Sequence, residues 1–219
     1  MGLILYTFDM SSSCVSVYFT QAALGLSCKR IQVNVWNKEF SPELIKINPQ
    51  HIVPTLNDSD CRTISDSHAI NIYLCETYGK TQTLYPENPE EQALVNDKLF
   101  FNASVVYPLL QKFQMILVRR EALSEKNVAK MCEVYKMLDN FLKARQWITG
   151  DSVNLADFGL IPNVTLANLF VPINFQKYPN VARWIKNAEQ LPFYHENINH
   201  LNMFSKFLEE RRRVVKSVL

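Results

Sequence analysis

The chain has 219 residues, of which 47% are hydrophobic and 20% charged, and its formal net charge at pH 7 is +2. This is an ordinary globular composition, and the length allows one large domain or two small ones. A net charge so close to zero argues against a nucleic acid as partner. No stretch reaches the roughly 18 apolar residues of a membrane-spanning helix, which argues against an integral membrane protein.

The five cysteines are an odd number, and no pair of them has the CxxC spacing. We therefore expect free thiols in a reducing compartment, with neither a disulfide framework nor a zinc site. The N-terminus also lacks the pattern of a secretory signal peptide. The sequence thus predicts a cytoplasmic protein without a bound metal.

Strand-like and helix-like patterns alternate over residues 1–79. The apolar run LILYTF predicts a first strand, and residues 11–26 carry Val15, Phe19 and Ala22 on one helical face. We expect a strand at 29–36, a short helix at 41–48, a hairpin over 53–65 and a helix at 66–79. This βαβ–αββα order predicts a small α/β domain.

Residues 80–89 are polar, include two prolines and read as an interdomain linker. Everything after them, residues 90–219, has helical periodicity. A long helix is expected at 90–120 with a bend near Pro108, and further helices at 124–145, 154–170, 180–191 and 200–215. The predicted architecture is therefore α/β followed by an all-α helical bundle.

The segment DMSSSCVSVYF, residues 9–19, joins the first strand to the first helix. It is either a polar helix start or a reaction centre with four candidates: Ser11, Ser12, Ser13 and Cys14. A second polar segment, SDSHAI, places Asp66 and Ser67 at the start of a helix. Capping is the ordinary role there, but free N–H groups and a carboxylate could also receive a ligand that carries both a carboxylate and an amine.

Two further motifs have mainly structural interpretations. Val53-Pro54 leads into a predicted strand, and we expect a trans bond because most X–Pro bonds are trans, although a cis bond would expose the backbone of Val53 to a ligand. In GDSVNLADF, Asn154 and Asp157 have the spacing of a capping box, which indicates a role in folding and not in catalysis. The sequence has no GxGxxG motif, no P-loop and no supported Ser-His-Asp arrangement.

Taken in this order, the βαβ–αββα unit, KINPQHIVPTL, DSHAINIYL, LFFNASVVYP and GDSVNLADF resemble the cytosolic glutathione transferases over the whole chain. The resemblance is greatest to the insect delta and epsilon classes, and to epsilon more than delta. It implies a thioredoxin-like domain that binds the co-substrate glutathione, a helical domain that lines a hydrophobic-substrate pocket, and a homodimer. The implied reaction is attack of the glutathione thiolate on small hydrophobic electrophiles, or their isomerisation, in detoxification.

The resemblance also implies roles for individual residues. Ser11 would hydrogen-bond the glutathione sulfur as the catalytic residue, and Val53-Pro54 would be cis with its backbone paired to glutathione. Asp66 and Ser67 would bind the γ-glutamyl end, and His51 and His68 would lie near the cysteinyl-glycine part. The side chains expected to line the hydrophobic-substrate pocket, or alternatively to pack in the core, are Phe101, Val105, Pro108, Leu109, Phe204 and Phe207.

The chain departs from the family pattern at two places. Ser13 stands where the family usually has proline, so Ser12 or Ser13 could share the role of Ser11. Glu39 would repel the glycine carboxylate of glutathione unless Lys38 or His51 compensates. Other roles for the same fold are an ecdysteroid-pathway enzyme, a hydrophobic-ligand carrier, a thiol transferase that uses Cys14, and an inactive scaffold.

Overall fold

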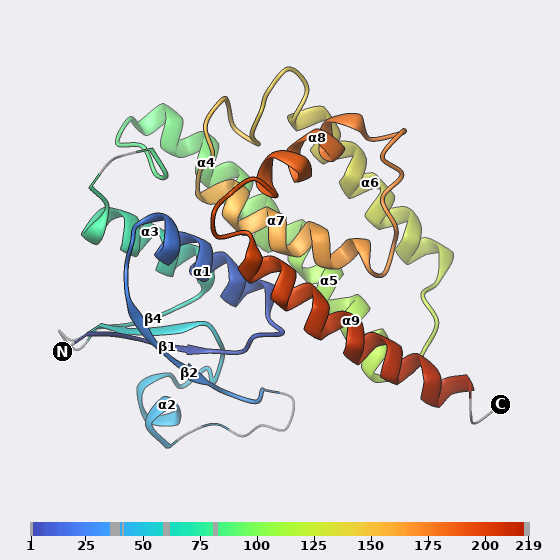
Figure 1. Cartoon of the computed structure of the whole chain (residues 1–219), viewed down its shortest axis with the longest axis horizontal. Helices are drawn as coiled ribbons and strands as arrows, with labels where there is room; N and C mark the ends of the chain where they lie inside the picture. Colours follow the sequence, from blue (N-terminus) through green and yellow to red (C-terminus); the bar gives the residue numbers. More distant parts are fainter. Residues whose placement is uncertain (1, 36–39, 41, 59–61, 81–82, 217–219) are drawn as a thin grey trace.

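The computed structural model describes residues 2–35, 40, 42–58, 62–80 and 83–216, without the side chains of residues 62 and 212–216. The described part contains a small sheet with helices on both faces, followed by an array of helices (Figure 1). This arrangement is the predicted α/β domain followed by an all-α domain.

The sheet has four strands in the order β2-β1-β3-β4 within the described residues. They are β1 (Leu3–Thr7), β2 (Cys28–Gln32), β3 (Thr55–Asp58) and β4 (Arg62–Ser65). Strand β1 runs parallel to β2 and antiparallel to β3, and β3 and β4 form an antiparallel hairpin. The order of strands and helices along the chain is the predicted βαβ–αββα, but β2 ends at Gln32 and is shorter than the predicted strand at 29–36.

The two faces of the sheet bury different cores, because successive strand side chains point to opposite sides. Leu3 and Leu5 of β1 belong to the large core, whereas Tyr6 packs with Val33 and Leu44 in a small one. The helices of this domain are α1 (Ser12–Ala23), α2 (Pro42–Ile47) and α3 (Ser67–Tyr78). Figure 1 shows α2 on one side of the sheet, and α1 and α3 on the side that faces the helical domain.

The C-terminal domain is helical throughout its described elements. These are α4 (Pro89–Phe101), the π-helical turn η1 (Asn102–Val106), α5 (Tyr107–Val118), α6 (Glu125–Phe141), α7 (Leu155–Asn168), α8 (Pro179–Ala188) and α9 (His195–Lys216). Helix α7 is buried along nearly its whole length and packs against α1 and α4. Helices α7 and α9 therefore carry the contact between the two domains through α1.

The predicted long helix at 90–120 is interrupted by the π-helical turn η1. In this turn the N–H of Tyr107 donates to the carbonyl of Asn102, five residues earlier. Pro108 follows immediately and has no N–H to donate to the carbonyl of Ser104, which disfavours a regular α-helix at this point. The extra residue of a π turn rotates α5 about the helix axis by roughly 100° relative to a continuous helix.

The capping box predicted at the start of α7 is confirmed. The Asn154 side chain accepts a hydrogen bond from the N–H of Ala156, and Asp157 accepts one from the N–H of Asn154. Asp157 is also bound by the N–H of Ile148 and by the indole N–H of Trp184. Its carboxylate thus joins α7, α8 and the preceding loop. Within the described ranges, no helix is both long and apolar enough to span a membrane.

Candidate active site

A cavity of about 470 Å³ lies between the loops of the α/β domain and the helices around the π-helical turn. Its walls include Ser11, His51, Val53, Pro54, Asp66, Ser67 and His68, which are the residues predicted to be catalytic or to bind glutathione. These residues come from three separate places in the sequence. The fold therefore brings all seven together at one cavity.

Ser11 lies at the N-cap of α1, where the chain turns from strand to helix. Its backbone is extended, and no capping hydrogen bond of its hydroxyl is found within the described chain. Ser12 and Ser13 also line the cavity, but Ser12 is almost completely buried. The Ser13 hydroxyl is a hydrogen-bond partner of Tyr107, whose pKa it lowers against the larger raising effect of burial. Of the three serines, Ser11 thus has its hydroxyl at the helix start without a capping partner.

Cys14 is completely buried beneath this helix start. Its sulfur accepts a hydrogen bond from the N–H of Phe8, at 3.5 Å. Burial raises the pKa of the Cys14 thiol, and the hydrogen bonds from Thr7, Phe8 and Ser11 lower it only in part. Reactive cysteines are accessible and have a lowered pKa, so the surroundings of Cys14 are those of a packing residue.

Asp66 is held at the N-cap of α3 in an uncommon backbone conformation, with φ of 76°. Its carboxylate accepts hydrogen bonds from the N–H groups of His68 (2.8 Å) and Ala69 (3.4 Å). The hydrogen bond with the His68 ring contributes most to the lowered pKa of Asp66. A non-glycine residue with positive φ costs free energy and is frequent at functional sites. The lowered pKa keeps the Asp66 carboxylate ionised at the edge of the cavity.

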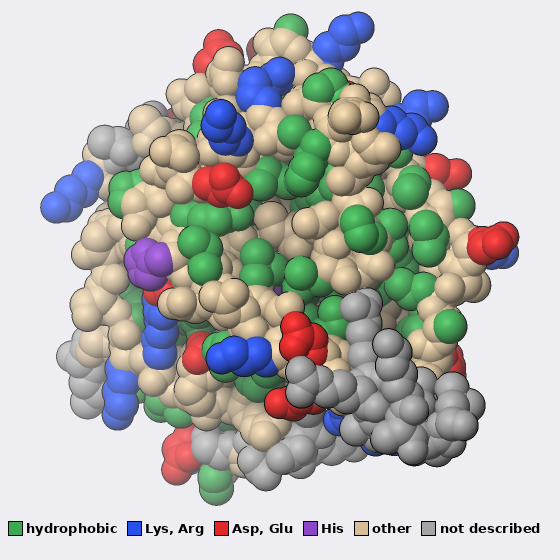
Figure 2. Space-filling model, turned by 45° about the vertical axis from the view of Figure 1, so that its right-hand side comes forward, with side chains coloured by type: hydrophobic (Ala, Val, Ile, Leu, Met, Phe, Trp, Pro, Cys, Tyr) green, Lys and Arg blue, Asp and Glu red, His purple; other side chains and the backbone are tan. Residues whose placement is uncertain are grey.

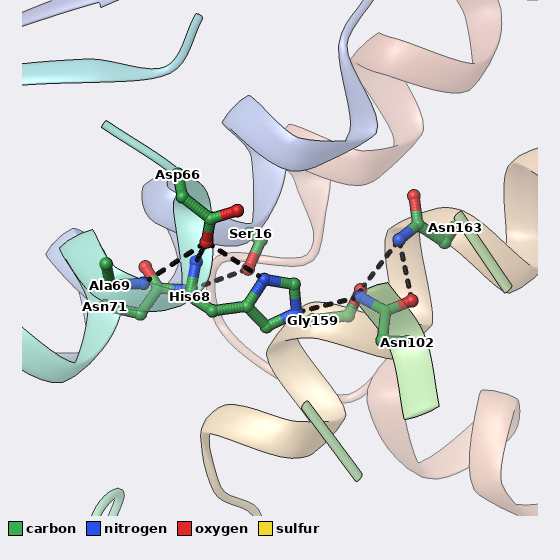
Figure 3. A network of polar contacts seen from close by, with 8 residues as sticks. All are labelled: Ser16, Asp66, His68, Ala69, Asn71, Asn102, Gly159 and Asn163. Carbon is green, nitrogen blue, oxygen red and sulfur yellow. Dashed lines mark hydrogen bonds and ion pairs between the residues drawn. The ribbon is translucent and has the colours of Figure 1, made fainter. Parts of the chain in front are cut away.

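His68 connects this carboxylate to the helical domain, as Figure 3 shows. One ring nitrogen lies 3.3 Å from Asp66 Oδ1, and the other lies 3.1 Å from the amide nitrogen of Asn102. Asn102, the first residue of the π turn, also donates to the carbonyl of Gly159 and accepts from the amide of Asn163. Asn163 itself lines the cavity. A continuous polar network thus runs from the start of α3 to α7.

The loop before β3 forms another wall of the cavity. The Val53-Pro54 peptide bond is cis, so the general expectation of a trans bond is wrong and the cis bond implied by the family resemblance is present. His51 has φ of 51°, and its ring lies 5.7 Å from that of Phe40. Glu39 and Lys38, which could affect the glycine end of glutathione, lie outside the described residues.

None of the six residues predicted for the hydrophobic-substrate pocket is among the described residues that line this cavity. Phe101 packs on Phe141 of α6, and Phe204 is completely buried in the core against Phe170. The remaining four are placed as follows: Leu109 is half-buried against the core, Val105 and Pro108 are exposed, and Phe207 is half-buried beneath Arg211. These six residues are thus not brought together at this cavity, and their role in binding a hydrophobic substrate stays a prediction.

The helical wall of the cavity is instead made by side chains that the sequence pattern did not single out. Ala103, Tyr107, Gln111 and Gln114 line it, in a row with spacings of three or four residues. Such a row marks one helical face. The helical spacing of Tyr107, Gln111 and Gln114 is the signal that could have found them. The apolar side chains of the predicted long helix favoured a different face as the wall of the pocket. The π turn rotates α5 and so changes which of its faces meets the cavity.

A second cavity of about 500 Å³ lies between the end of α5 and α9, lined by Phe113, Leu117, Phe170 and Leu208, among others. Figure 2 turns the molecule so that the side where α5 and α9 end comes forward, and hydrophobic side chains are spread over the middle of that face. None of the predicted site residues lines this second cavity in the described chain. In the same described part, no group of His, Cys, Asp and Glu side chains is arranged to hold a metal ion.

Comparison with known proteins gives the same assignment along most of the chain. Residues 5–83 match the family model of the glutathione S-transferase N-terminal domain, and residues 93–192 match that of the C-terminal domain. The chain is 35% identical over 209 residues to glutathione S-transferase D6 of Drosophila melanogaster, covering 94% of this chain and 96% of that protein.

Solved structures agree with the sequence comparison. A glutathione transferase homologue from Drosophila mojavensis, with bound glutathione, has a TM-score of 0.91 and 37% identity over 96% of this chain and 97% of that one. An epsilon-class glutathione S-transferase from the housefly, Musca domestica, has a TM-score of 0.91 and 33% identity over 95% of this chain and 98% of that one. The chain therefore belongs to the glutathione S-transferase family, among the insect delta and epsilon proteins.

Proposed function

We propose that the chain binds glutathione in the 470 Å³ cavity and transfers its thiolate to small hydrophobic electrophiles, in detoxification. The observation that carries this proposal is the convergence of two helix starts on the cavity, that of α1 with Ser11 and that of α3 with Asp66 and Ser67. A helix start carries a partial positive charge, which suits the sulfur and the α-carboxylate of glutathione.

The proposed mechanism requires that the thiol of glutathione be ionised near neutral pH. A free thiol has a pKa of about 8.5, and each unit by which the site lowers this value corresponds to about 1.4 kcal/mol. The Ser11 hydroxyl and the start of α1 would stabilise the thiolate by a hydrogen bond and by their positive potential. Buried Cys14 lies beneath Ser11, so a mechanism in which Cys14 forms a disulfide with the substrate is disfavoured.

The amine of the γ-glutamyl group would pair with the Asp66 carboxylate, and Asp66→Asn tests this. Asparagine is also a good N-cap, so α3 keeps its start while the charge is lost. We expect glutathione to bind about tenfold more weakly, because a charged hydrogen bond is worth roughly 1.5–3 kcal/mol before solvent screening. Isothermal titration calorimetry with glutathione measures the effect, and kcat at saturating glutathione is expected to change little.

Asp151→Asn is the matched control, because Asp151 is exposed and is not among the residues that line the cavity. It removes the same charge and is expected to leave the affinity for glutathione unchanged. An Asp66→Asn protein that binds glutathione as tightly as the wild type would contradict the placement of the γ-glutamyl group. A wild-type protein that binds no glutathione would contradict the proposed function itself.

The second substrate would lie beside the thiolate, against the α5 wall of the cavity. Tyr107, Gln111 and Gln114 offer polar groups there, and Phe8 and Met10 offer apolar surface from the α/β domain. This lining suits an electrophile with an apolar body and a polar substituent. A screen of electrophiles and steroid-like ligands for glutathione-dependent turnover separates detoxification from a steroid-pathway or ligand-carrying role.

We further propose that the chain is a cytosolic homodimer divided into domains at 1–79 and 90–219, with the linker at 80–89. The unmatched interval between the two family models, residues 84–92, overlaps this linker. Exposed apolar side chains on neighbouring helices support the dimer: Phe100 of α4 is 70% exposed and Met137 of α6 is 41% exposed. Large exposed hydrophobic side chains that lie on adjacent elements often mark interfaces.

Phe100→Glu is expected to convert the dimer to a monomer at micromolar concentration, because a charge would be buried in the interface without a partner. Sedimentation velocity measures the change. Phe175→Glu is the matched control, since Phe175 is 47% exposed but lies in the segment between α7 and α8 and belongs to neither α4 nor α6. A Phe100→Glu protein that sediments like a wild-type dimer would place the interface elsewhere.

A further inference from the structure

A buried histidine of α9 contacts the segment that leads to Ser11. His200 is 1% exposed, and its Nδ1 lies 3.0 Å from the backbone carbonyl of Asp9. A carbonyl only accepts hydrogen bonds, so Nδ1 carries the proton and donates it. Asp9 is two residues before Ser11, whereas His200 lies 191 residues further along the chain. The C-terminal helix thus holds the main chain directly before the catalytic serine.

The same segment is held from α9 by a second route. Glu196, one turn before His200, forms an ion pair with Arg30 of β2 at 2.9 Å. The Arg30 guanidinium lies 3.6 Å from the centre of the Tyr18 ring, and the Tyr18 hydroxyl donates to Asp9 Oδ1 at 2.9 Å. Gln32 donates to the same oxygen. Helix α9 therefore contacts the backbone carbonyl of Asp9 directly, through His200. It contacts the Asp9 carboxylate indirectly, through Arg30 and Tyr18.

Packing alone does not account for a histidine at this position. The other ring nitrogen, Nε2, is buried without a hydrogen-bond partner among the described residues. Burying an unpaired polar atom costs free energy, and an apolar side chain would fill the same space next to Phe204 without that cost. Burial also lowers the pKa of His200 to about 4, so the ring is neutral at physiological pH and keeps a single donor. The one polar contact that the ring makes within the described chain is the one with Asp9.

We propose that His200 is a positioning residue for the transferase reaction, which holds the carbonyl of Asp9 and thereby sets where the Ser11 hydroxyl meets the sulfur of glutathione. This inference rests on the proposed function. The N–H of Ser11 donates to the carbonyl of Phe8 at 2.8 Å, so residues 8–11 form a tight turn, and His200 holds the middle of it. Loss of the hydrogen bond moves the hydroxyl without removing it, and it leaves the γ-glutamyl site at Asp66 and Ser67 untouched.

The test compares two substitutions of nearly equal size in the full-length protein. His200→Leu removes the donor, whereas His200→Asn keeps an amide N–H close to the position of Nδ1. Leucine and asparagine both branch at Cγ and have the same number of side-chain heavy atoms, so the two variants differ mainly in the presence of the donor. His195→Leu is the control, because it changes an exposed histidine of the same helix. The measurements are kcat and KM for glutathione with an aryl halide, the pH profile of kcat/KM, and the ultraviolet absorbance of the thiolate of bound glutathione as a function of pH.

For His200→Leu we expect kcat to fall by about tenfold and the pH midpoint of thiolate formation to rise by about half a unit, because small displacements of a catalytic group are costly. The KM for glutathione is expected to stay within about twofold of the wild-type value, since its main binding contacts are elsewhere. His200→Asn is expected to recover most of the loss, and His195→Leu to match the wild type.

The outcomes separate the two proposals. If the wild type forms a thiolate with bound glutathione, and His200→Leu has the same kcat and pH midpoint, the positioning role is overturned and the transferase function stands. Equal losses in His200→Leu and His200→Asn also overturn it, because they would report packing and not the hydrogen bond. If the wild type forms no glutathione thiolate, the proposed function fails, and this inference fails with it.

Discussion

Replacing Ser11 by alanine is expected to lower kcat with an aryl halide by about 100-fold, the effect of removing one preorganised donor from a developing or stabilised anion. Ser11 lines the cavity at the start of α1, where its hydroxyl has no capping partner within the described chain. That hydroxyl is a hydrogen-bond partner of the buried Cys14 thiol, and we expect it to donate to the sulfur of glutathione when glutathione binds. Without it, the helix start alone stabilises the thiolate.

The same substitution is expected to change the pH profile in a defined direction. A donor to the thiolate favours the charged form and lowers the pKa of the thiol, so its loss raises that pKa. Activity requires the thiolate and rises with pH through this pKa. The midpoint of kcat/KM against pH is therefore expected to move upward by about 1–2 units in Ser11→Ala, since one unit corresponds to about 1.4 kcal/mol.

Ser13→Ala and Cys14→Ser are the controls for Ser11. The Ser13 hydroxyl is paired with Tyr107, and Cys14 is completely buried, so neither is expected to move the pH midpoint by as much as Ser11→Ala. A larger shift in Ser13→Ala than in Ser11→Ala would transfer the role to Ser13. Loss of activity in Cys14→Ser alone would favour thiol-transfer chemistry instead.

Asp157→Ala is expected to destabilise the protein by about 3–5 kcal/mol at pH 7. This is the usual cost of removing one partner from a buried charged network. The carboxylate is completely buried and accepts hydrogen bonds from the N–H groups of Ile148 and Asn154 and from the Trp184 indole. Alanine leaves these three donors without an acceptor. The start of α7 would lose one half of its capping box, and α8 would lose its link to α7 through Trp184.

The difference in stability is expected to grow as the pH falls from 7 to 5. Burial raises the pKa of Asp157 to about 6 in the folded protein, from 3.8. A folded-state pKa above the unfolded value means that the folded protein binds the proton more tightly. The pH-dependent part of the stability that comes from this shift is then fully present below about pH 4 and is lost as the pH rises through 6, whereas the hydrogen bonds to the ionised carboxylate remain at pH 7. Between pH 7 and pH 5 the expected change is about 1 kcal/mol.

Urea unfolding followed by circular dichroism, at both pH values, measures these differences. Asn154→Ala removes the other half of the capping box and is expected to cost only about 1 kcal/mol, the usual effect of losing an N-cap. Asp151→Ala changes an exposed carboxylate of the preceding loop and is expected to change little. An Asp157→Ala protein that is destabilised by no more than Asn154→Ala would mean that the network around the carboxylate contributes nothing beyond the cap.

Local patterns in the sequence were sufficient for the order of elements and for the cap of α7. The apolar run of β1, the helical face of α1 and the Asn154–Asp157 spacing are each set by residues close together in the chain, so periodicity and side-chain chemistry reveal them directly. The polar helix starts at Ser11 and Asp66 were recognisable for the same reason. The helix start at Asp66 by itself suggested a site for a ligand with an amine and a carboxylate, whereas the proposed catalytic role of Ser11 came from the resemblance to a family.

The wall of the cavity depends on contacts that no local pattern carries. The π turn at Asn102–Val106 rotates α5, so Tyr107 and Gln111 meet the cavity, whereas Val105 and Pro108 face solvent. Phe204 joins the core because α9 packs on α1 and α7. No local pattern marks His200, since its acceptor is a backbone carbonyl 191 residues away. Short-range periodicity thus determines the helices and strands, but the packing between them decides which face of each helix reaches the site.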